Sequence, residues 1–394
     1  MSGKTVGKFT EALSAVADQR LRVFLVGSLL MVVFLGVHFS RLFLPGELAT
    51  GDAQQGYAAF FGAARFAVSG VDTGNLYDPG VFQATIGAET TLLWLYPPPM
   101  LFLLAPLGLG SYGAAKLILV FATIVCAGTL GRLASGTNFW GAITFISPAA
   151  FATLFVGQVS AFFGLLLVAG LFFAERRPLV AGACFALLTL KPQYGLLVIP
   201  FLVAVRAWRA IAAAMVFTLL MILASIGVFG AEMWRDFFES LMNGVHAAYY
   251  QSGGHPGRIT ISDAIKAVGL AAPPGWALYP PLIIAAVIGL FVVAKKASRP
   301  MLVAYTLAAS AVICPYLFVY DFFLYGAAVL IIATHIQTLK PLETYLLAAL
   351  WFAPIAPFIG GSTLTPALVW PLTAFGVFII YRMAVRRQGS APVT

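Results

Sequence analysis

The sequence predicts an all-α membrane protein with about twelve transmembrane helices. The 394-residue chain is 61% hydrophobic and only 9% charged, whereas soluble chains carry roughly 25% charged residues. Apolar runs of about 17–25 residues, long enough to cross a bilayer as helices, recur along nearly the whole chain. The Lys and Arg residues stand between these runs, where the positive-inside rule places them on the cytoplasmic side. We therefore attribute the net charge of +9 to membrane topology and expect no nucleic-acid partner.

The N-terminal part predicts an anchored chain with a long first outer loop. Residues 1–20 are polar and basic, which places them in the cytoplasm. The apolar run Leu21–Phe43 has no clear cleavage site after it, so we interpret it as a retained anchor. Residues 44–111 then form the first outer loop, with a weakly amphipathic stretch over 54–68 and an apolar piece, Met100–Leu109, that is too short to span.

The rest of the chain predicts a single integral membrane domain, counted over residues 1–394. Residues 112–229 hold core helices, 230–275 a second outer loop with an aromatic amphipathic piece at Met233–Met242, 276–381 the C-terminal helices, and 382–394 a cytoplasmic tail. The predicted spans lie at about 112–131, 138–156, 159–175, 178–191, 193–206, 210–229, 276–294, 300–318, 321–336, 342–358 and 364–381.

We predict a helix break at Lys191-Pro192. The alternative is one tilted helix over 178–206, with Met100–Leu109 extended into a span of its own. Proline disrupts helix interiors and a lysine in mid-membrane is costly, so a break is physically reasonable. A break also places on the cytoplasmic side five arginines, Arg132, Arg176, Arg177, Arg206 and Arg209.

In this topology the rare polar residues gather near the outer face. A membrane enzyme with a lipid-borne substrate would place its site there, whereas the inner charges resemble topology signals. The outer set consists of Asp52, Gln54, Arg65, Asp72, Asp78, Tyr96, Gln158, Lys191, Gln193, His246, His255, Arg258, Tyr320 and Asp321.

Asp52 is the candidate catalytic residue. It stands in Gly51-Asp52-Ala53-Gln54, about nine residues past the end of the first apolar run. One interpretation is a helix N-cap, because Asp is favoured there and a helix-like run follows. The other is a general base that deprotonates an acceptor hydroxyl. The two are compatible, since a cap would also fix the position of the carboxylate.

Lys191 stands inside an apolar run, directly before Pro192. It either extends its ammonium to a headgroup or binds an anionic group such as a lipid phosphate. Asp321 is either an interfacial charge or a second polar contact in the same cavity. Gly157-Gln158 joins two spans and needs no function as a turn. Arg258 either binds phosphate or is a loop charge.

Sequence motifs give no support to ATP hydrolysis or zinc chemistry. The chain contains no P-loop, G-x-S-x-G, H-E-x-x-H or C-x-x-C pattern. His246 and His255 are nine residues apart and lack the spacing of metal ligands.

Short motifs in a particular order resemble those of glycosyltransferase family 87, mannosyltransferase-like membrane enzymes of the GT-C class. The resemblance runs from about residue 45 to 335. Its motifs are Gly51-Asp52, Asn75-Leu76-Tyr77-Asp78-Pro79, Tyr96-Pro97-Pro98 followed by Ala105-Pro106-Leu107, Ser147-Pro148, Gly157-Gln158, Ala181-Gly182 leading to Leu190-Lys191-Pro192, and Pro315-Tyr316 near Tyr320-Asp321.

The resemblance implies a GT-C-like fold in the bacterial inner membrane, with the active site facing the periplasm. Such enzymes move a hexose, often mannose, from a polyprenyl-phosphate carrier to an acceptor hydroxyl on a glycolipid or glycan, usually with inversion. Asp52 maps onto the expected base and Lys191 onto the contact with the carrier phosphate. We expect no cofactor and no required metal. Membrane lipids are expected partners.

The remaining outer residues are predicted to contact substrate or phosphate. They are Arg258, Arg65, Tyr96, Gln158, Gln193, Tyr320, Asp321, His246 and His255. Some family members carry a His after the late Pro motif, and this chain has none there, so the proton-relay partner of Asp52 is not identified.

The main alternative is a transporter or flippase for envelope glycolipid precursors. Broken helices and buried ions occur in transporters too. Transporters, however, commonly show internal repeats and polar residues near the bilayer midplane, and this sequence shows neither.

Overall fold

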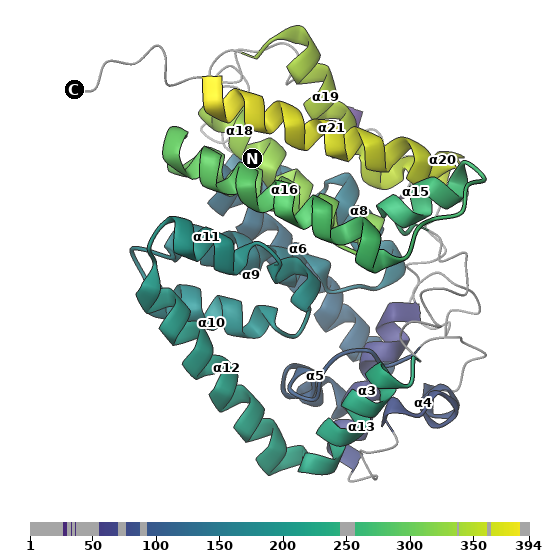
Figure 1. Ribbon diagram of the computed structural model, residues 1–394. Coiled ribbons are helices and arrows are strands. Elements are labelled where there is room, and N and C mark those ends of the chain that lie inside the picture. Colours follow the sequence, from purple (N-terminus) through teal and green to yellow (C-terminus); the bar gives the residue numbers. More distant parts are fainter. Residues whose placement is uncertain are drawn as a thin grey trace, which may run out of the picture.

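The computed structural model is helical throughout the part of the chain that it describes (Figure 1). The described residues are 27–29, 33, 36, 55–69, 76–86, 93–244, 257–336, 339–360 and 364–386. Within these ranges the one pairing of strand type is an isolated antiparallel bridge between Arg258 and Phe318. An all-helical architecture confirms the predicted class, because in a bilayer a helix satisfies its own backbone groups.

In the described residues of the predicted first outer loop there are three helices. They are α3 (Gln55–Ser69), α4 (Pro79–Ile86) and α5 (Met100–Gly108). Helix α3 lies directly against α5, since a methyl group added at Gly108 would come within 2.3 Å of the Ala64 carbonyl oxygen. The stretches expected at 54–68 and 100–109 are therefore both helical.

The next four helices are separated by sharp breaks. They are α6 (Tyr112–Ser135), α7 (Asn138–Phe145), α8 (Pro148–Val156) and α9 (Ser160–Phe173). The Ser147 hydroxyl accepts from the Ala150 N–H at the start of α8, and Pro148 occupies the first turn. Gly157 ends α8 at φ +78°, a conformation that favours glycine. These caps fix the turn that leads into α9.

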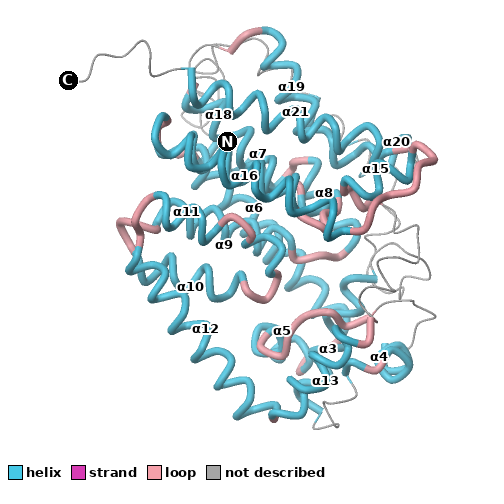
Figure 2. Tube along the Cα trace, in the orientation of Figure 1, coloured by secondary structure: helices cyan, strands magenta, loops and turns pink. Residues whose placement is uncertain are grey.

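The predicted break at Lys191-Pro192 is present. Helix α10 (Pro178–Leu188) stops before it, and the chain continues as a 3₁₀ turn, η3 (Pro192–Gly195), and a short helix, α11 (Val198–Ala204). The alternative of one helix over 178–206 is therefore wrong. Next come α12 (Trp208–Phe229) and α13 (Ala231–Met242), and Figure 2 shows α12 leaving the bundle obliquely to reach α13 beside α3 and α5.

The C-terminal part packs as an antiparallel group. Helices α17 and α18 are buried along most of their length, whereas α16 exposes apolar side chains. The elements of this part are α15 (Ile261–Ala267), α16 (Gly275–Lys296), α17 (Arg299–Ile313), η4 (Val319–Asp321), α18 (Phe323–His335), α19 (Pro341–Phe352), η5 (Ala353–Ile355), α20 (Ala356–Gly360) and α21 (Thr365–Arg386).

Fewer helices than predicted are long enough to cross a bilayer. In the described ranges α6, α12, α16 and α21 qualify by length and composition, and α7 with α8, bent by 41°, would add a fifth. The breaks at Gly157 and Pro192 leave α9, α10 and α11 with 14, 11 and 7 residues. About twelve spans is thus not confirmed, and Leu21–Phe43 lies largely outside the described residues.

Candidate active site

Lys191 emerges from a break in regular structure. At the end of α10 the Lys191 N–H bonds to the Leu188 carbonyl at 3.0 Å, a tighter turn than an α-helix makes. Lys191 itself is extended, with φ −135° and ψ +70°, because the following Pro192 disfavours helical geometry there. The break turns the lysine side chain into the protein, where it is only 6% exposed.

Lys191 forms a buried ion pair with Asp321. The Nζ atom lies 2.6 Å from Asp321 Oδ1, and it also contacts the hydroxyls of Ser160 at 3.2 Å and Tyr194 at 3.4 Å. All three donors of the ammonium therefore have acceptors. The expectation that Lys191 extends to a headgroup is wrong, because its charge is neutralised inside the protein.

Asp321 accepts four hydrogen bonds from three different segments. Its Oδ1 atom receives Lys191, the Ser160 hydroxyl at 2.6 Å and the Tyr194 hydroxyl, while Oδ2 receives the Phe318 N–H at 3.1 Å. The side chain is completely buried. Asp321 is therefore no interfacial charge. It joins the start of α9, the break after α10 and the η4 turn.

Aromatic rings surround the ammonium. Its Nζ lies 4.6 Å from the ring centroid of Tyr194, 5.6 Å from that of Tyr320 and 5.9 Å from that of Phe163. Distances up to about 6 Å allow cation–π attraction. The Tyr96 ring stacks on Phe163 with centroids 6.4 Å apart. Two predicted site residues, Tyr96 and Tyr320, thus belong to the shell around Lys191.

A second ion pair is attached to the same region. Ile259 N–H donates to the Leu317 carbonyl at 2.7 Å, and Val319 N–H donates to the Gly257 carbonyl at 2.9 Å. These bonds hold Arg258 against the segment that leads into Asp321. The Arg258 guanidinium donates two hydrogen bonds to Asp263 Oδ1, from Nε at 2.9 Å and from Nη2 at 2.6 Å. Its charge, like that of Lys191, is matched by a carboxylate.

The first turn of α3 touches the turn that precedes Ser160. A methyl group added at Gly56 would lie 2.4 Å from the Gly157 carbonyl oxygen, so the two backbones are in direct contact. The Tyr57 hydroxyl donates to the Leu154 carbonyl at 3.0 Å. Lys116, one turn inside α6, holds its Nζ 5.8 Å from the Tyr57 ring centroid. Residues just after Asp52 in the chain are thus fastened beside the Lys191 centre.

Tyr77 links the first loop to this shell. Its hydroxyl donates to the Tyr96 carbonyl at 2.9 Å. Burial raises the pKa of Tyr77 well above its ordinary value, and the negative charge of Asp236 raises it further. The phenol therefore remains a protonated donor at neutral pH.

The other predicted residues are dispersed or lie outside the described ranges. Gln158 lies in the turn next to Ser160, and Gln193 is partly exposed on η3. Arg65 is exposed and its Nη1 donates to the Gly108 carbonyl at 3.3 Å. Asp52, His246 and His255 lie outside the described residues.

Sequence reasoning missed several members of the centre. Ser160 and Tyr194 complete the shell of Asp321, Asp263 neutralises Arg258, and Lys116 adds a cation near α3. Tyr194 stands three residues after Lys191, a spacing that offered a clue. Nothing local marks Ser160, because its partner is 161 residues away.

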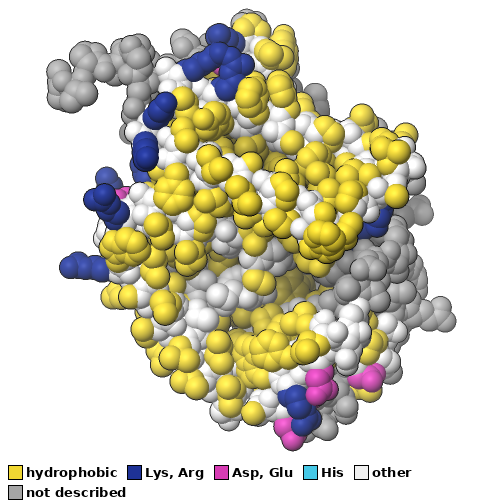
Figure 3. All heavy atoms as spheres, viewed as in Figure 1, with side chains coloured by type: hydrophobic (Ala, Val, Ile, Leu, Met, Phe, Trp, Pro, Cys, Tyr) yellow, Lys and Arg dark blue, Asp and Glu magenta, His cyan; other side chains and the backbone are white. Residues whose placement is uncertain are grey.

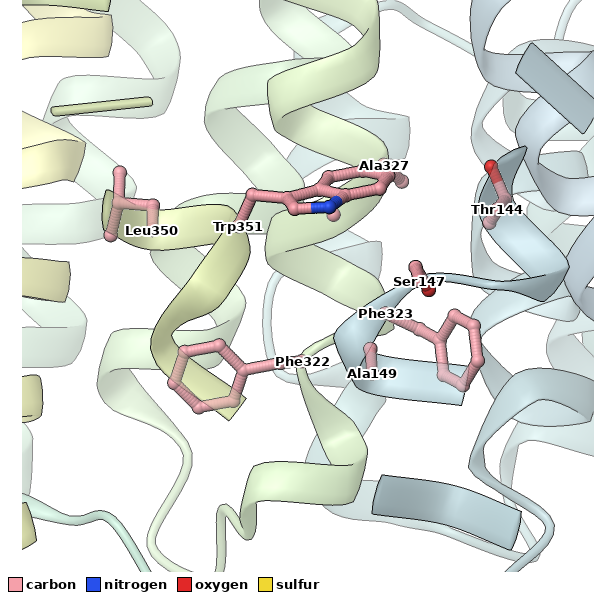
Figure 4. Close-up of a pocket in the computed structure, with 9 residues that line it drawn as sticks. Thr144, Ser147, Ala149, Phe322, Phe323, Ala327, Leu350 and Trp351 are labelled. Atoms are coloured by element: carbon pink, nitrogen blue, oxygen red, sulfur yellow. The ribbon is translucent and has the colours of Figure 1, made fainter. Parts of the chain in front are cut away.

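A small pocket nearby has a different character. It lies between the α7–α8 turn, α18 and α19, lined by Thr144, Ser147, Ala149, Phe322, Phe323, Gly326, Ala327, Leu350 and Trp351 (Figure 4). None of these side chains titrates near neutral pH. Among the described residues no three His, Cys, Asp or Glu side chains converge as a metal site requires. The chemistry-bearing groups instead gather at Lys191 and Asp321, and the absence of a required metal stays a prediction.

The sequence profile described as Glycosyltransferase family 87 matches residues 94–319. That match covers more than half of the 394 residues and contains Lys191 and the whole Arg258–Asp263 ion pair. The chain belongs to glycosyltransferase family 87. No curated protein and no solved structure matches it.

Membership makes the protein a membrane glycosyltransferase, an enzyme that requires a sugar donor and an acceptor. The resemblance found in the sequence is thereby confirmed. The profile begins at Trp94 and ends at Val319, two residues before Asp321. Lys191 and the rings of Phe163 and Tyr194 therefore lie inside the matched range, whereas Tyr320 and Asp321 directly follow it.

Proposed function

We propose that this family 87 glycosyltransferase moves a hexose, mannose-like in stereochemistry, from a polyprenyl-phosphate carrier to an acceptor hydroxyl. The transfer takes place at the outer face of the membrane. The observation that carries the proposal is the contact between α3 and the Gly157 turn. It supports a site in which the region after Asp52 adjoins the buried Lys191–Asp321 pair. The acceptor is a hydroxyl of a glycolipid or glycan, and the enzyme acts in the inner membrane of a bacterium.

Asp52 is the proposed general base. Helix α3 begins three residues later, and three residues reach at most about 11 Å. The proposed base is therefore close in the sequence to Gly56, whose backbone contacts the Gly157 turn. In the proposed step the Asp52 carboxylate takes the acceptor's proton and the freed oxygen attacks the anomeric carbon. The bond from that carbon to the phosphate oxygen breaks, its electrons leave with the carrier phosphate, and the configuration inverts.

Lys191 acts in this proposal mainly by holding the site together. A phosphate that contacted Lys191 would compete with Ser160, Tyr194 or Asp321 for the ammonium. Displacing Asp321 would break a buried ion pair, at a cost of about 3–5 kcal/mol. Lys116 is a cation near the first turn of α3. We assign to it the stabilisation of the departing phosphate.

An apolar surface suits the isoprenoid tail. The face in Figure 3 is hollowed between α16 and α5, and apolar side chains line the hollow. On α12 the exposed side chains include Leu219 and Leu223, and on α16 they include Ile284 and Ile288. A tail of hydrocarbon would bury such surface favourably.

The test is a transfer assay with purified enzyme, a panel of polyprenyl-phosphate sugars and mass spectrometry of extracted lipids. Asp52→Asn should lower transfer by about 10²–10⁴-fold, the usual contribution of a general base, without loss of folded protein. Asp78→Asn is the matched control, since Asp78 Oδ1 caps α4 by accepting from the Val81 N–H at 2.9 Å. Wild-type turnover in Asp52→Asn would reject the base.

The transporter alternative has a separate readout. If the protein were a transporter, vesicles reconstituted with it would show movement of lipid-linked sugar across the bilayer without formation of a transfer product. Flux without transfer for every donor would reject the proposed reaction while leaving the family assignment in place.

A further inference from the structure

Three helix-to-helix turns form a cationic patch at the end of the molecule away from the candidate site. They are the α9–α10 turn (174–177), the α11–α12 turn (205–207) and the α16–α17 turn (297–298). Helix α9 starts at the Lys191 centre and ends at this patch 14 residues later, about 21 Å away. Anything that binds the patch therefore leaves the candidate site free.

Arg299 fastens the three turns to one another. Its Nη2 atom donates to the Leu171 carbonyl at 3.1 Å and lies 3.3 Å from Glu175 Oε2 at the α9–α10 turn. Its guanidinium also lies 4.4 Å from the ring centroid of Phe201 in α11. The turns are thus held in a fixed arrangement by a side chain of α17.

The patch carries far more positive than negative charge. Within and beside these turns seven basic side chains face one carboxylate, Glu175. Six of the seven are exposed, and only Arg299 is partly buried. Figure 3 shows Lys and Arg gathered along this edge of the molecule. The basic residues are Arg176, Arg177, Arg206, Arg209, Lys295, Lys296 and Arg299.

Arg206 occupies a position where the backbone favours glycine. Its φ is +57°, and it is the only non-glycine residue of the described ranges with positive φ. L side chains rarely adopt this conformation. It ends α11, where helices usually carry glycine. An arginine here departs from what the fold prefers, which indicates a use for its side chain beyond helix termination.

Exposed apolar side chains adjoin the cations. Trp208 is 58% exposed and Leu179 is 67% exposed, each within three residues of a basic residue of the patch. Tryptophan beside arginine at the end of apolar helices is the pattern of a membrane–water interface. The cations therefore lie at headgroup depth, where phosphate groups are the abundant anions.

We propose that the three turns form a binding site for the headgroup of an anionic phospholipid. Arginine suits this role, because its planar guanidinium donates two parallel hydrogen bonds to a phosphate and is less strongly hydrated than an ammonium. Basic pockets between helices on one side of a membrane protein bind such headgroups. The site is independent of the proposed sugar transfer.

The experiment measures lipid retention by native mass spectrometry. Full-length protein is purified from nanodiscs of phosphatidylcholine that contain phosphatidylglycerol as the anionic probe. Wild type should retain phosphatidylglycerol in preference to phosphatidylcholine. Arg206→Gly combined with Arg209→Gln should lower that preference at least roughly fivefold, on the usual effect of one basic residue near an anionic surface. Arg206→Gly is chosen because glycine fits the backbone at this position. Replacing Arg209→Gln by Arg209→Lys in the double variant should restore part of the preference for phosphatidylglycerol.

A control variant and a second binding measurement, with inorganic phosphate, decide the outcome. Lys266→Gln removes an exposed cation on α15, distant from the patch, and should leave the preference unchanged. An unchanged preference in the double variant would overturn the proposal, as would an equal loss in Lys266→Gln. Saturable binding of inorganic phosphate to lipid-free protein, lost in the double variant, would assign the patch to a soluble anion instead.

Discussion

Neutralising Asp321 should destabilise the protein more than neutralising Asp321 and Lys191 together. Asp321→Asn keeps the shape of the side chain but leaves the Lys191 ammonium buried at 6% exposure without a counter-ion. Lys191→Met leaves a buried carboxylate that retains hydrogen bonds from Ser160, Tyr194 and Phe318. The double variant carries neither of the two buried charges of this pair. Comparing its free energy of unfolding with those of the two single variants therefore gives the interaction energy between the two side chains.

The geometry sets the expected magnitudes. At a Nζ to Oδ1 distance of 2.6 Å, an effective dielectric constant near 20 gives an attraction of about 6 kcal/mol. Burying the two ions costs several kcal/mol each, so the net value of the pair is small. Removing one partner costs about 3–5 kcal/mol. The double variant should lose only the hydrogen bonds of the ammonium, about 1–2 kcal/mol.

The free energy of unfolding is measured by titration with a denaturing detergent, followed by circular dichroism. Each single variant should lose about 3–5 kcal/mol, with Lys191→Met at the lower end. The matched control is Arg235→Met, since Arg235 is 62% exposed beside Asp236 at 3.4 Å. Its loss should be at most about 1 kcal/mol.

Additive losses would refute the reasoning. If the double variant lost the sum of the two single losses, Lys191 and Asp321 would not form the pair described here. The donor KM of the folded double variant separates the two roles of Lys191. An unchanged KM indicates that Lys191 positions the site, whereas a rise of tenfold or more indicates that it contacts the carrier phosphate.

Three further predictions concern the surroundings of the centre. Gly56→Ala should cost about 1–3 kcal/mol of stability and reduce transfer, because the added methyl meets a backbone carbonyl at 2.4 Å. Both variants are compared by thermal unfolding. The control is Gly113→Ala, at a helical glycine with open space around it, which should be neutral or stabilising. Arg258→Lys should cost about 1–3 kcal/mol, because lysine cannot reproduce the two-point grip on Asp263; an unchanged melting temperature would contradict this. Tyr77→Phe should cost about 1 kcal/mol near neutral pH. Since the pKa of Tyr77 is raised on folding, its contribution is fully present below its ordinary pKa of 10.0 and declines above it. The phenylalanine variant should therefore lose stability less steeply at alkaline pH, and identical slopes would contradict the buried phenol.

Local sequence determined where the chain breaks. Pro192 removes a backbone donor and restricts Lys191, so the end of α10 follows from two adjacent residues. Ser147-Pro148 begins a helix and Gly157 ends it for the same kind of local reason. The lengths of the helices between breaks were harder to predict, because a broken span and two short spans have the same apolar composition.

The partner of Lys191 was decided only by the tertiary structure. Asp321 stands 130 residues away along the chain, and its sequence neighbourhood fits an interfacial charge equally well. Arg258 differs, because its partner Asp263 is only five residues away; the bridge to Phe318, 60 residues along the chain, is what joins this pair to the Asp321 region. Ion pairs form between side chains that folding brings within a few ångströms, and hydrophobic periodicity contains no information about that proximity.

The sequence by itself determined an all-helical membrane chain, the break at Lys191 and, through short motifs in order, membership of glycosyltransferase family 87. It also singled out Lys191, Asp321, Tyr96 and Tyr320, which the fold brings together, but not Ser160 or Tyr194. Only the tertiary structure decided that Lys191 is neutralised by Asp321 and enclosed by Ser160, Tyr194 and aromatic rings. The physical reason is that apolar patterning and proline act over a few residues, whereas charge compensation acts through space between segments that the sequence keeps far apart.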